Sequence, residues 1–304
     1  MPTTNPITAS LHTPLVLDGA MGTELEQYGV KTNDALWSAN ALLTDPEAIY
    51  QVHARYFQAG ADIAITDTYQ ANVAAFARVG ISHSQALQLI RRGVQLAQQA
   101  RADVNPRGFV AGCVGPYGAY LANGAEYTGD YQLSAAEYAA FHTEKVQTLL
   151  SAGVDLLSVD TMPNFFEIQV LTQLLAQQPN LVPTWISLSI RDPQTLSDGT
   201  PLTTVVQWLD AQDVVSGIGV NCTDFAQILP AIQTIRAQSE KPIVVYPNPG
   251  DHYDPHTKTW TPVPHALTFA EVVPSWLAAG ATIIGGCCRT TPADIAQITT
   301  LLKK

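Results

Sequence analysis

Two adjacent cysteines near the end of the chain, Cys287 and Cys288, carry the most evident chemistry in this sequence. They lie in GATIIGGCCRTTP, after a β-branched run over residues 282–284 that predicts a buried strand and before a Thr-Thr-Pro run that predicts a helix start. The two glycines between strand and thiols favour a sharp turn. Neighbouring cysteines rarely close a disulfide, whereas soft thiolates bind zinc well. The alternative interpretation is a pair of small buried side chains, since free cysteine is often fully buried.

A third thiol, Cys222, lies in VNCT at another predicted junction between a strand and a helix. If these strands belong to one parallel barrel, their carboxyl ends converge and the three thiols can meet. Three protein ligands with an open fourth position are typical of a catalytic zinc, whereas a structural zinc is closed by four. The remaining cysteine, Cys113 in GCVGP, lies inside a predicted strand, where a buried core cysteine is the simpler interpretation.

Strand and helix patterns alternate along the whole chain, which predicts about eight β/α units. Eight such units close a (β/α)₈ TIM-type barrel, so we expect residues 1–304 to form a single barrel domain. The predicted strands cover residues 15–17, 62–66, 108–114, 154–159, 184–190, 217–220, 242–246 and 282–284. The predicted helices cover residues 45–59, 82–101, 134–152, 164–177, 203–211, 224–238, 267–279 and 292–302.

Two long loops interrupt this alternation, over residues 117–132 and 248–265. They follow the third and seventh predicted strands, which places both on the catalytic face of a barrel. Loops of this length are usually lids or binding loops, and both are rich in tyrosine or tryptophan. Several polar residues also follow predicted strands on that face: Asp18, Asp67, Asp160 and Asn221.

The composition excludes several classes of function. The chain has 304 residues and a formal net charge of −11, with no basic patch, so nucleic-acid binding is not expected. The first residues lack the basic and apolar regions of a signal peptide, and no stretch of about 18 apolar residues occurs, so no membrane association is expected. Four cysteines are too few and too scattered for a disulfide scaffold. These features favour a cytoplasmic protein with reduced thiols.

Several motifs together resemble the homocysteine S-methyltransferase family. The motifs are LDGAMGTELE, TDTYQAN, GPYGAYLANGAEYTGDY, SIRDPQTLSDGTPL, GVNCT, VVYPNPGDHYDPHTKTW and GGCCRTTP. The similarity runs over nearly the whole chain, and the pairing of GVNC with GGCC is its most specific feature. The length and the lack of further domains resemble the S-methylmethionine-dependent, single-domain members.

The resemblance implies that Cys222, Cys287 and Cys288 bind Zn²⁺ and that the thiolate of homocysteine takes the fourth ligand position. Zinc would keep that thiol deprotonated at neutral pH, and a sulfonium donor, S-methylmethionine or S-adenosylmethionine, would give it a methyl group to form methionine. The displacement needs positioning rather than a general base, so no catalytic side chain is expected.

The resemblance also implies the substrate-binding residues. Asp18 and the carboxylate after the fourth strand would bind the ammonium group of homocysteine. The amides around Gly19 and Ala20 would approach its carboxylate, and Asp67 and Asn221 complete the set. A turn or helix-cap role is the alternative for Asp18.

Three positions depart from the family pattern: Asp160 replaces the usual Glu, Asp67 replaces the usual Asn, and Asp251 replaces a common Glu. These changes affect the amino-acid pocket rather than the thiols, so the acceptor could differ, for example selenohomocysteine or another thiol. A zinc-containing protein that binds a thiol amino acid without turnover, and a metal-free barrel with reduced core thiols, are the other hypotheses. The sequence does not rank the methyl donors and does not predict the oligomeric state.

Overall fold

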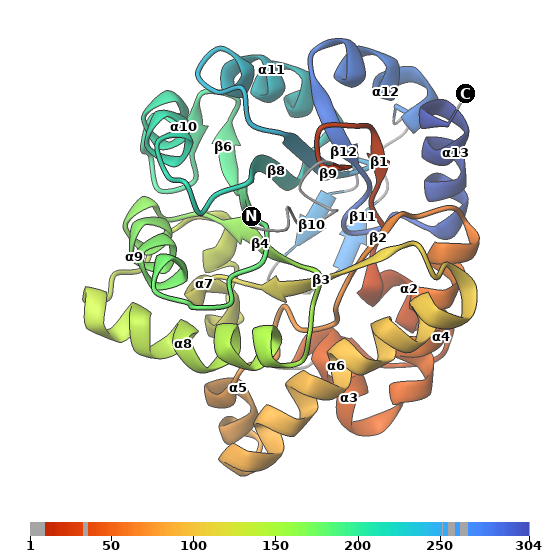
Figure 1. The fold of residues 1–304 in the computed structure, drawn as a ribbon, viewed down its shortest axis with the longest axis vertical. Coiled ribbons are helices and arrows are strands. Elements are labelled where there is room, and N and C mark those ends of the chain that lie inside the picture. Colours follow the sequence, from red (N-terminus) through yellow and green to blue (C-terminus); the bar gives the residue numbers. More distant parts are fainter. Residues whose placement is uncertain (1–9, 33–35, 251, 255–258, 262–266, 304) are drawn as a thin grey trace, which may run out of the picture.

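Eight parallel strands form one sheet that closes into a barrel. The computed structural model describes residues 10–32, 36–250, 252–254, 259–261 and 267–303. The strands are hydrogen-bonded in the order β1-β12-β9-β8-β5-β4-β3-β2. Leu17 pairs in parallel with Ile63, and the Asp62 N–H donates to Val16 O at 2.7 Å, so the two ends of that order also meet. Helices surround the strands (Figure 1), and the predicted (β/α)₈ TIM-type barrel is confirmed.

The barrel strands fall where the alternating pattern predicted them, with differences of a few residues at their ends. They are β1 Leu15–Val16, β2 Ile63–Ile65, β3 Phe109–Val114, β4 Leu156–Met162, β5 Thr184–Leu188, β8 Gly217–Asp224, β9 Ile243–Asn248 and β12 Ala281–Ile284. Two short antiparallel hairpins lie outside the barrel sheet, β6 Ile190–Asp192 with β7 Thr195–Leu196, and β10 His252–Asp254 with β11 Thr259–Thr261.

Each predicted helix is present, and several short helices were not predicted. The long helices are α4 Pro46–Gln58, α6 His83–Val104, α8 Ala135–Ser151, α9 Phe165–Ala176, α10 Leu202–Asp210, α11 Phe225–Arg236, α12 Phe269–Ala278 and α13 Pro292–Leu302. The short ones are α2 Met21–Gln27, η1 Trp37–Asn40, α3 Ala41–Thr44, α5 Val73–Arg78, α7 Tyr117–Leu121 and η2 Ala125–Tyr127. None of the helices in the described part of the chain has the length and apolarity needed to cross a membrane.

The helix starts follow the capping signals in the sequence. Asp45 caps α4 by accepting a hydrogen bond from the Ala48 N–H at 3.3 Å, with proline at the first helical position. Ser134 and Glu137 form the capping box predicted for α8. Thr291 and its capping box begin α13, directly after the cysteine pair. These caps fix where each strand ends and where the following helix begins.

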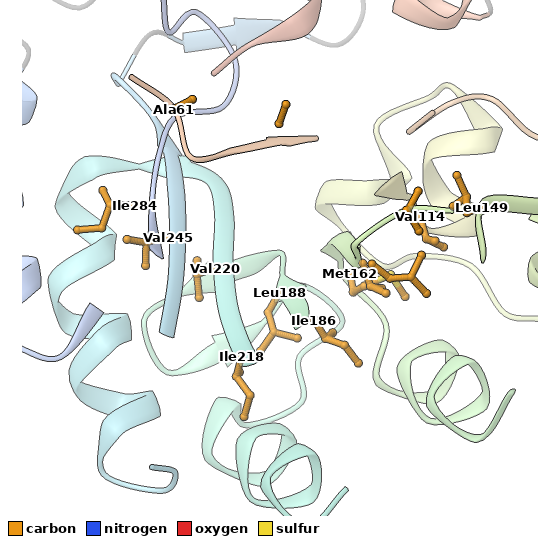
Figure 2. Packing of buried hydrophobic residues seen from close by; sticks show 14 of the residues in the cluster. Ala61, Val114, Leu149, Met162, Ile186, Leu188, Ile218, Val220, Val245 and Ile284 are labelled. Carbon is orange, nitrogen blue, oxygen red and sulfur yellow. The ribbon is translucent and has the colours of Figure 1, made fainter. Parts of the chain in front are cut away.

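Alternate residues along each strand pack into two separate cores. Residues that point into the barrel, such as Leu17, Trp185 and Ile283, form an inner cluster. Their neighbours, such as Val220 and Ile284, point outward and pack against the surrounding helices (Figure 2). This two-residue period is the normal side-chain geometry of a strand, and it leaves the carboxyl ends of the strands to line a pocket.

The two predicted long loops both contain regular structure. The first includes α7 and η2, and most of its tyrosines pack outside the pocket, where Tyr117 contacts Tyr120 and Tyr131 with ring centroids 5.3 and 5.8 Å apart. The second forms the β10–β11 hairpin. Within that loop, residues 251, 255–258 and 262–265 lie outside the described part of the chain.

Candidate metal and substrate site

One pocket gathers the strand-end residues that the sequence singled out. It lies at the carboxyl ends of the barrel strands and is lined by residues from β2, β3, β4, β8 and β9 and by the segments that follow β1 and β12. All nine predicted site residues belong to its lining: Asp18, Gly19, Ala20, Asp67, Asp160, Asn221, Cys222, Cys287 and Cys288. The barrel therefore brings residues from opposite ends of the chain to one place.

The three predicted thiols form a compact cluster on one side of this pocket. The Sγ atoms of Cys222, Cys287 and Cys288 all lie within 4.8 Å of one another. Cys222 Sγ and Cys288 Sγ are 3.7 Å apart. Each thiol is partly exposed, so the cluster is open toward the pocket. The soft donor set and its open side fit a zinc ion with one free position.

Hydrogen bonds distribute the acidity of the three thiols unequally. Contacts first with Cys287 and then with Cys288 hold the pKa of Cys222 well below its usual value. A hydrogen bond with Cys222 raises the pKa of Cys287. A second hydrogen bond with Cys222 raises the pKa of Cys288. Tyr127 Oη lies 3.3 Å from Cys222 Sγ, and Asn248 Nδ2 donates to the same sulfur at 3.7 Å.

The backbone around the thiols explains how they come together. Cys222 has φ 52°, a left-handed conformation that is uncommon for a residue other than glycine. A Cβ on Gly285 would lie 2.6 Å from Asp18 O, because β1 and β12 approach closely at their ends. Neither Gly285 nor Gly286 has positive φ, so the predicted need for a sharp glycine turn was wrong. Glycine is required at Gly285 for space, not for conformation.

Asp18 and Asp160 lie in the same pocket as the thiols, and both are nearly completely buried. Asp18 Oδ2 accepts a hydrogen bond from the Ile65 N–H at 2.8 Å, which links the end of β1 to β2. Burial raises the pKa of Asp18 well above its usual value, and the negative charge of Asp160 raises it further. The two carboxylates are therefore close enough to interact, as two groups that bind one ammonium must be.

Asp160 is oriented by three hydrogen-bond donors. Its Oδ1 accepts from Ser158 Oγ and from Tyr246 Oη, the latter at 2.7 Å. Its Oδ2 accepts from Cys113 Sγ at 2.9 Å. Burial nevertheless raises the pKa of Asp160. Cys113 is buried as predicted, but it is also a pocket residue, and it lies outside the three-thiol cluster.

A buried lysine that the sequence analysis did not single out partly balances these acids. Lys145, on α8, donates from Nζ to Tyr69 O at 2.9 Å. Burial lowers the pKa of Lys145 to about 8, while the nearby Cys113 and Asp160 oppose that shift. The lysine is nearly completely buried, and its charge acts on Asp160 and Cys113.

The remaining predicted residues have contacts within the protein. The Ala20 N–H donates to Thr290 Oγ1 at 3.1 Å. The Asn221 side chain accepts from the Thr161 N–H at 2.9 Å and donates to Thr161 Oγ1 at 2.8 Å. This clamp fixes Thr161, which has φ 57° and directly follows Asp160. Asp67 Oδ1 accepts from Ser38 Oγ at 2.5 Å.

Sequence reasoning missed most of the residues that support the site. Ser158, Lys145 and Tyr246 lie inside predicted strands or helices, and no local pattern distinguishes them from core positions. Tyr127 and Glu126 did carry a signal, because they lie in the aromatic loop after the third strand. Both line the pocket, and Glu126 is nearly completely buried.

Comparison with known families identifies one clear match. The family model for homocysteine S-methyltransferase matches residues 15–302. The homocysteine S-methyltransferase of Escherichia coli (strain K12) is 48% identical over 303 residues, covering 97% of both chains. Homocysteine S-methyltransferase YbgG of Bacillus subtilis (strain 168) is 43% identical over 305 residues, covering 97% of this chain and 96% of the relative.

A solved structure agrees with these matches. The metallated form of the homocysteine methyltransferase MmuM from Escherichia coli superposes with a TM-score of 0.86 at 45% identity. The alignment covers 95% of this chain and 96% of that one. The similarity therefore includes both the barrel and the loops that build the pocket.

Proposed function

The chain belongs to the homocysteine S-methyltransferase family, and we propose that it uses zinc and a sulfonium methyl donor to convert homocysteine into methionine. Methyl transfer to homocysteine is the activity of this family, so the chain is an enzyme. The observation that carries the finer proposal is the division of the pocket. Three thiols form one cluster in its lining, here called the thiol side, and the buried carboxylates Asp18 and Asp160 form a second group, here called the carboxylate side.

The thiol cluster is the proposed zinc site. Cys222, Cys287 and Cys288 would hold the ion, because thiolates are preferred zinc ligands and the three sulfurs lie within one coordination sphere of each other. Zinc bound there would supply the positive charge that keeps the acceptor thiol deprotonated near neutral pH. Tyr127 and Asn248 would orient Cys222 through their contacts with its sulfur.

The carboxylate side is the proposed site for the ammonium group of homocysteine. Asp18 and Asp160 are both buried, and the negative charge of Asp160 raises the pKa of Asp18. A positively charged ligand group would therefore stabilise the ionised carboxylates. Three donors already orient Asp160, but a carboxylate offers about four lone-pair sites, so one remains for a ligand. Because Ala20 N–H donates to Thr290, the Gly19 amide is the better candidate for the substrate carboxylate.

The donor would be a sulfonium cation, which matches the acidic and aromatic character of the pocket. Tyr69, Tyr127 and Trp37 line it beside the acids, and aromatic faces attract cations. The acceptor sulfur forms a bond to the methyl carbon as the carbon–sulfonium bond breaks, and that electron pair leaves with the neutral sulfide. No proton moves in this step, so the protein contributes by positioning the two sulfurs and excluding water.

We further propose that residues 1–304 act as one homocysteine-binding barrel domain in the cytoplasm, where the thiols stay reduced. The partners are small molecules: homocysteine and the methyl donor. S-methylmethionine and S-adenosylmethionine are both sulfonium amino acids, so either matches the proposed site. We propose S-methylmethionine as the preferred donor and S-adenosylmethionine as the second choice.

A donor panel tests the proposal. Zinc-loaded protein is incubated with homocysteine and, separately, S-methylmethionine, S-adenosylmethionine or betaine, and methionine is quantified. We expect S-methylmethionine to be used at least as well as S-adenosylmethionine, and betaine not at all. Robust transfer from betaine would refute the sulfonium assignment. Homocysteine binding without turnover by any donor would instead identify a thiol-amino-acid-binding protein, and turnover only with selenohomocysteine would identify a different acceptor.

A further inference from the structure

Asp67 differs from Asp18 and Asp160, the two carboxylates assigned above to the ammonium group of homocysteine. It follows β2, lines the pocket and has only 3% of its surface exposed. Its Oδ1 accepts a hydrogen bond from Ser38 Oγ, but its Oδ2 has no hydrogen-bond partner among the described residues. Asp18 and Asp160, by contrast, are each tied to protein donors.

An unpaired carboxylate oxygen in this environment is energetically unfavourable. Burial of a charged group without a hydrogen-bond partner costs the full desolvation penalty of that group. Burial also raises the pKa of Asp67 to about 6, with the Ser38 hydrogen bond opposing the shift. Lys145 is coupled to Asp160 and Cys113, and no ion pair with Asp67 is formed within the described part of the chain. A cationic group of a ligand could therefore supply the partner that the described part of the chain does not.

The Ser38 contact directs the free oxygen. Ser38 lies on η1, and its hydroxyl fixes one oxygen of the carboxylate. With Oδ1 fixed, rotation of the carboxylate is restricted, so Oδ2 is held buried and without a partner beside the pocket that Asp67 lines. This is the arrangement expected of a residue that recognises a ligand donor.

The ligand chemistry follows from the proposed function, on which this inference rests. Homocysteine brings one α-ammonium group, for which Asp18 and Asp160 provide two carboxylates. A sulfonium amino acid such as S-methylmethionine brings a second α-ammonium group, which needs its own acceptor. We infer that Asp67 Oδ2 binds the α-ammonium group of an amino-acid ligand, and because Asp18 and Asp160 are already assigned to homocysteine, we assign that ligand as the methyl donor.

The test compares ligands with and without the α-amino group. Zinc-loaded wild-type and Asp67→Asn proteins are assayed with S-methylmethionine and with its deamino analogue, (3-carboxypropyl)dimethylsulfonium, which keeps the sulfonium and the carboxylate. The acceptor pair is homocysteine and 4-sulfanylbutanoate, whose dissociation constants are measured by calorimetry. Asparagine keeps an oxygen for Ser38 but removes the negative charge, so the fold should be retained.

We expect Asp67→Asn to lower kcat/KM for S-methylmethionine at least tenfold and to leave the deamino donor nearly unchanged. Homocysteine affinity should change less than twofold. If homocysteine affinity falls instead, and 4-sulfanylbutanoate affinity does not, Asp67 binds an α-ammonium but the source is the acceptor. Equal losses for ligands with and without the amino group, or no loss for any, would overturn the inference.

Ser38→Ala is the matched control, because it keeps the charge and removes only the contact that orients it. We expect a smaller loss than for Asp67→Asn, again confined to the ligand with the amino group. Absence of methyl transfer in the wild-type protein would contradict the proposed function, but calorimetric titration of both amino acids and their deamino analogues would still decide the role of Asp67.

Discussion

The two sides of the pocket are prepared for positive charge in different ways. On the thiol side, Cys222, Cys287 and Cys288 come together through strand ends and an unusual backbone conformation, and few protein donors contact their sulfurs. On the carboxylate side, Asp18 and Asp160 are oriented by hydrogen bonds from other barrel strands. One side is organised mainly by the main chain, and the other mainly by side chains.

This difference suggests how each side depends on its ligand. Thiols gathered without many donors need a metal ion to share their negative charge, so their arrangement and the ion should be lost together. Carboxylates oriented by protein donors keep their geometry without a ligand, at the expense of burying charge. Substitutions should therefore separate the two sides: changes among the thiols should remove the metal, and changes among the carboxylates should spare it.

The largest effect should follow loss of two thiols. The double substitution Cys222→Ala with Cys287→Ala should reduce zinc from about one ion per chain to about none, because a single thiolate cannot hold it. Methyl transfer should be lost at the same time. Metal analysis of purified protein measures this, with Cys113→Ser as the matched control, since Cys113 lies outside the cluster and should leave zinc unchanged. Stoichiometric zinc in the double variant would contradict the assignment of the zinc site to the three thiols.

Asp160→Asn should weaken homocysteine binding while leaving the zinc content intact. The expected loss is about 2–4 kcal/mol, the range for removing one member of a buried charge pair. Asp160→Glu should be tolerated, because it keeps the charge and extends it toward the pocket. Titration of homocysteine into the zinc-loaded variants measures both. Unchanged affinity in Asp160→Asn would move the role to Asp18 or Asp67.

Asp67→Asn should stabilise the protein in the absence of amino-acid ligands. The folded-state pKa of about 6 lies above the ordinary value of 3.8, so the ionised carboxylate destabilises the fold above pH 6, and this penalty disappears below about pH 4. At pH 7.5 we expect a gain of about 1–2 kcal/mol, since the new buried amide offsets part of the relief. Denaturant unfolding at pH 7.5 and pH 4 measures it. A gain that does not shrink at the lower pH would contradict the electrostatic cause.

The smallest effect should come from Tyr127→Phe, which removes one hydrogen bond to Cys222 Sγ. A hydrogen bond of this kind contributes about 0.5–1.5 kcal/mol, so zinc affinity should fall about threefold to tenfold. Competition with a chelator measures it. Tyr120→Phe is the control from the same loop, because Tyr120 does not line the pocket. Equal effects of the two substitutions would point to the loop as a whole rather than to the contact with sulfur.

Local patterns in the sequence predicted the barrel and the thiol cluster well. The strands and helices have periodic apolar residues, and capping residues or glycines mark where they end. The β-branched runs, the capping residues of α4, α8 and α13 and the glycines before Cys287 all lie next to the residues that they organise. The family resemblance added the roles of the strand-end acids.

The supporting network was not predictable from the sequence for a physical reason. Tyr246 reaches Asp160 from β9, which is not a neighbour of β4, Cys113 reaches it from the adjacent strand β3, and the charge of Lys145 acts on it from a helix. Such contacts depend on which strands lie opposite each other and on rotamers, and neither has a local sequence signature. A structural role for Gly285 was predicted, but the reason given for it was wrong. The reason is the close approach of β1, which is a tertiary contact without a local sequence signature.

X-ray absorption at the zinc edge tests the central claim most directly, because it counts sulfur neighbours of the metal in the intact protein. The account predicts about three sulfur ligands in zinc-loaded protein and about four after homocysteine is added, with the fourth lost when methionine replaces homocysteine. A sulfur count that stays the same with and without homocysteine, or that includes fewer than three protein sulfurs, would contradict it.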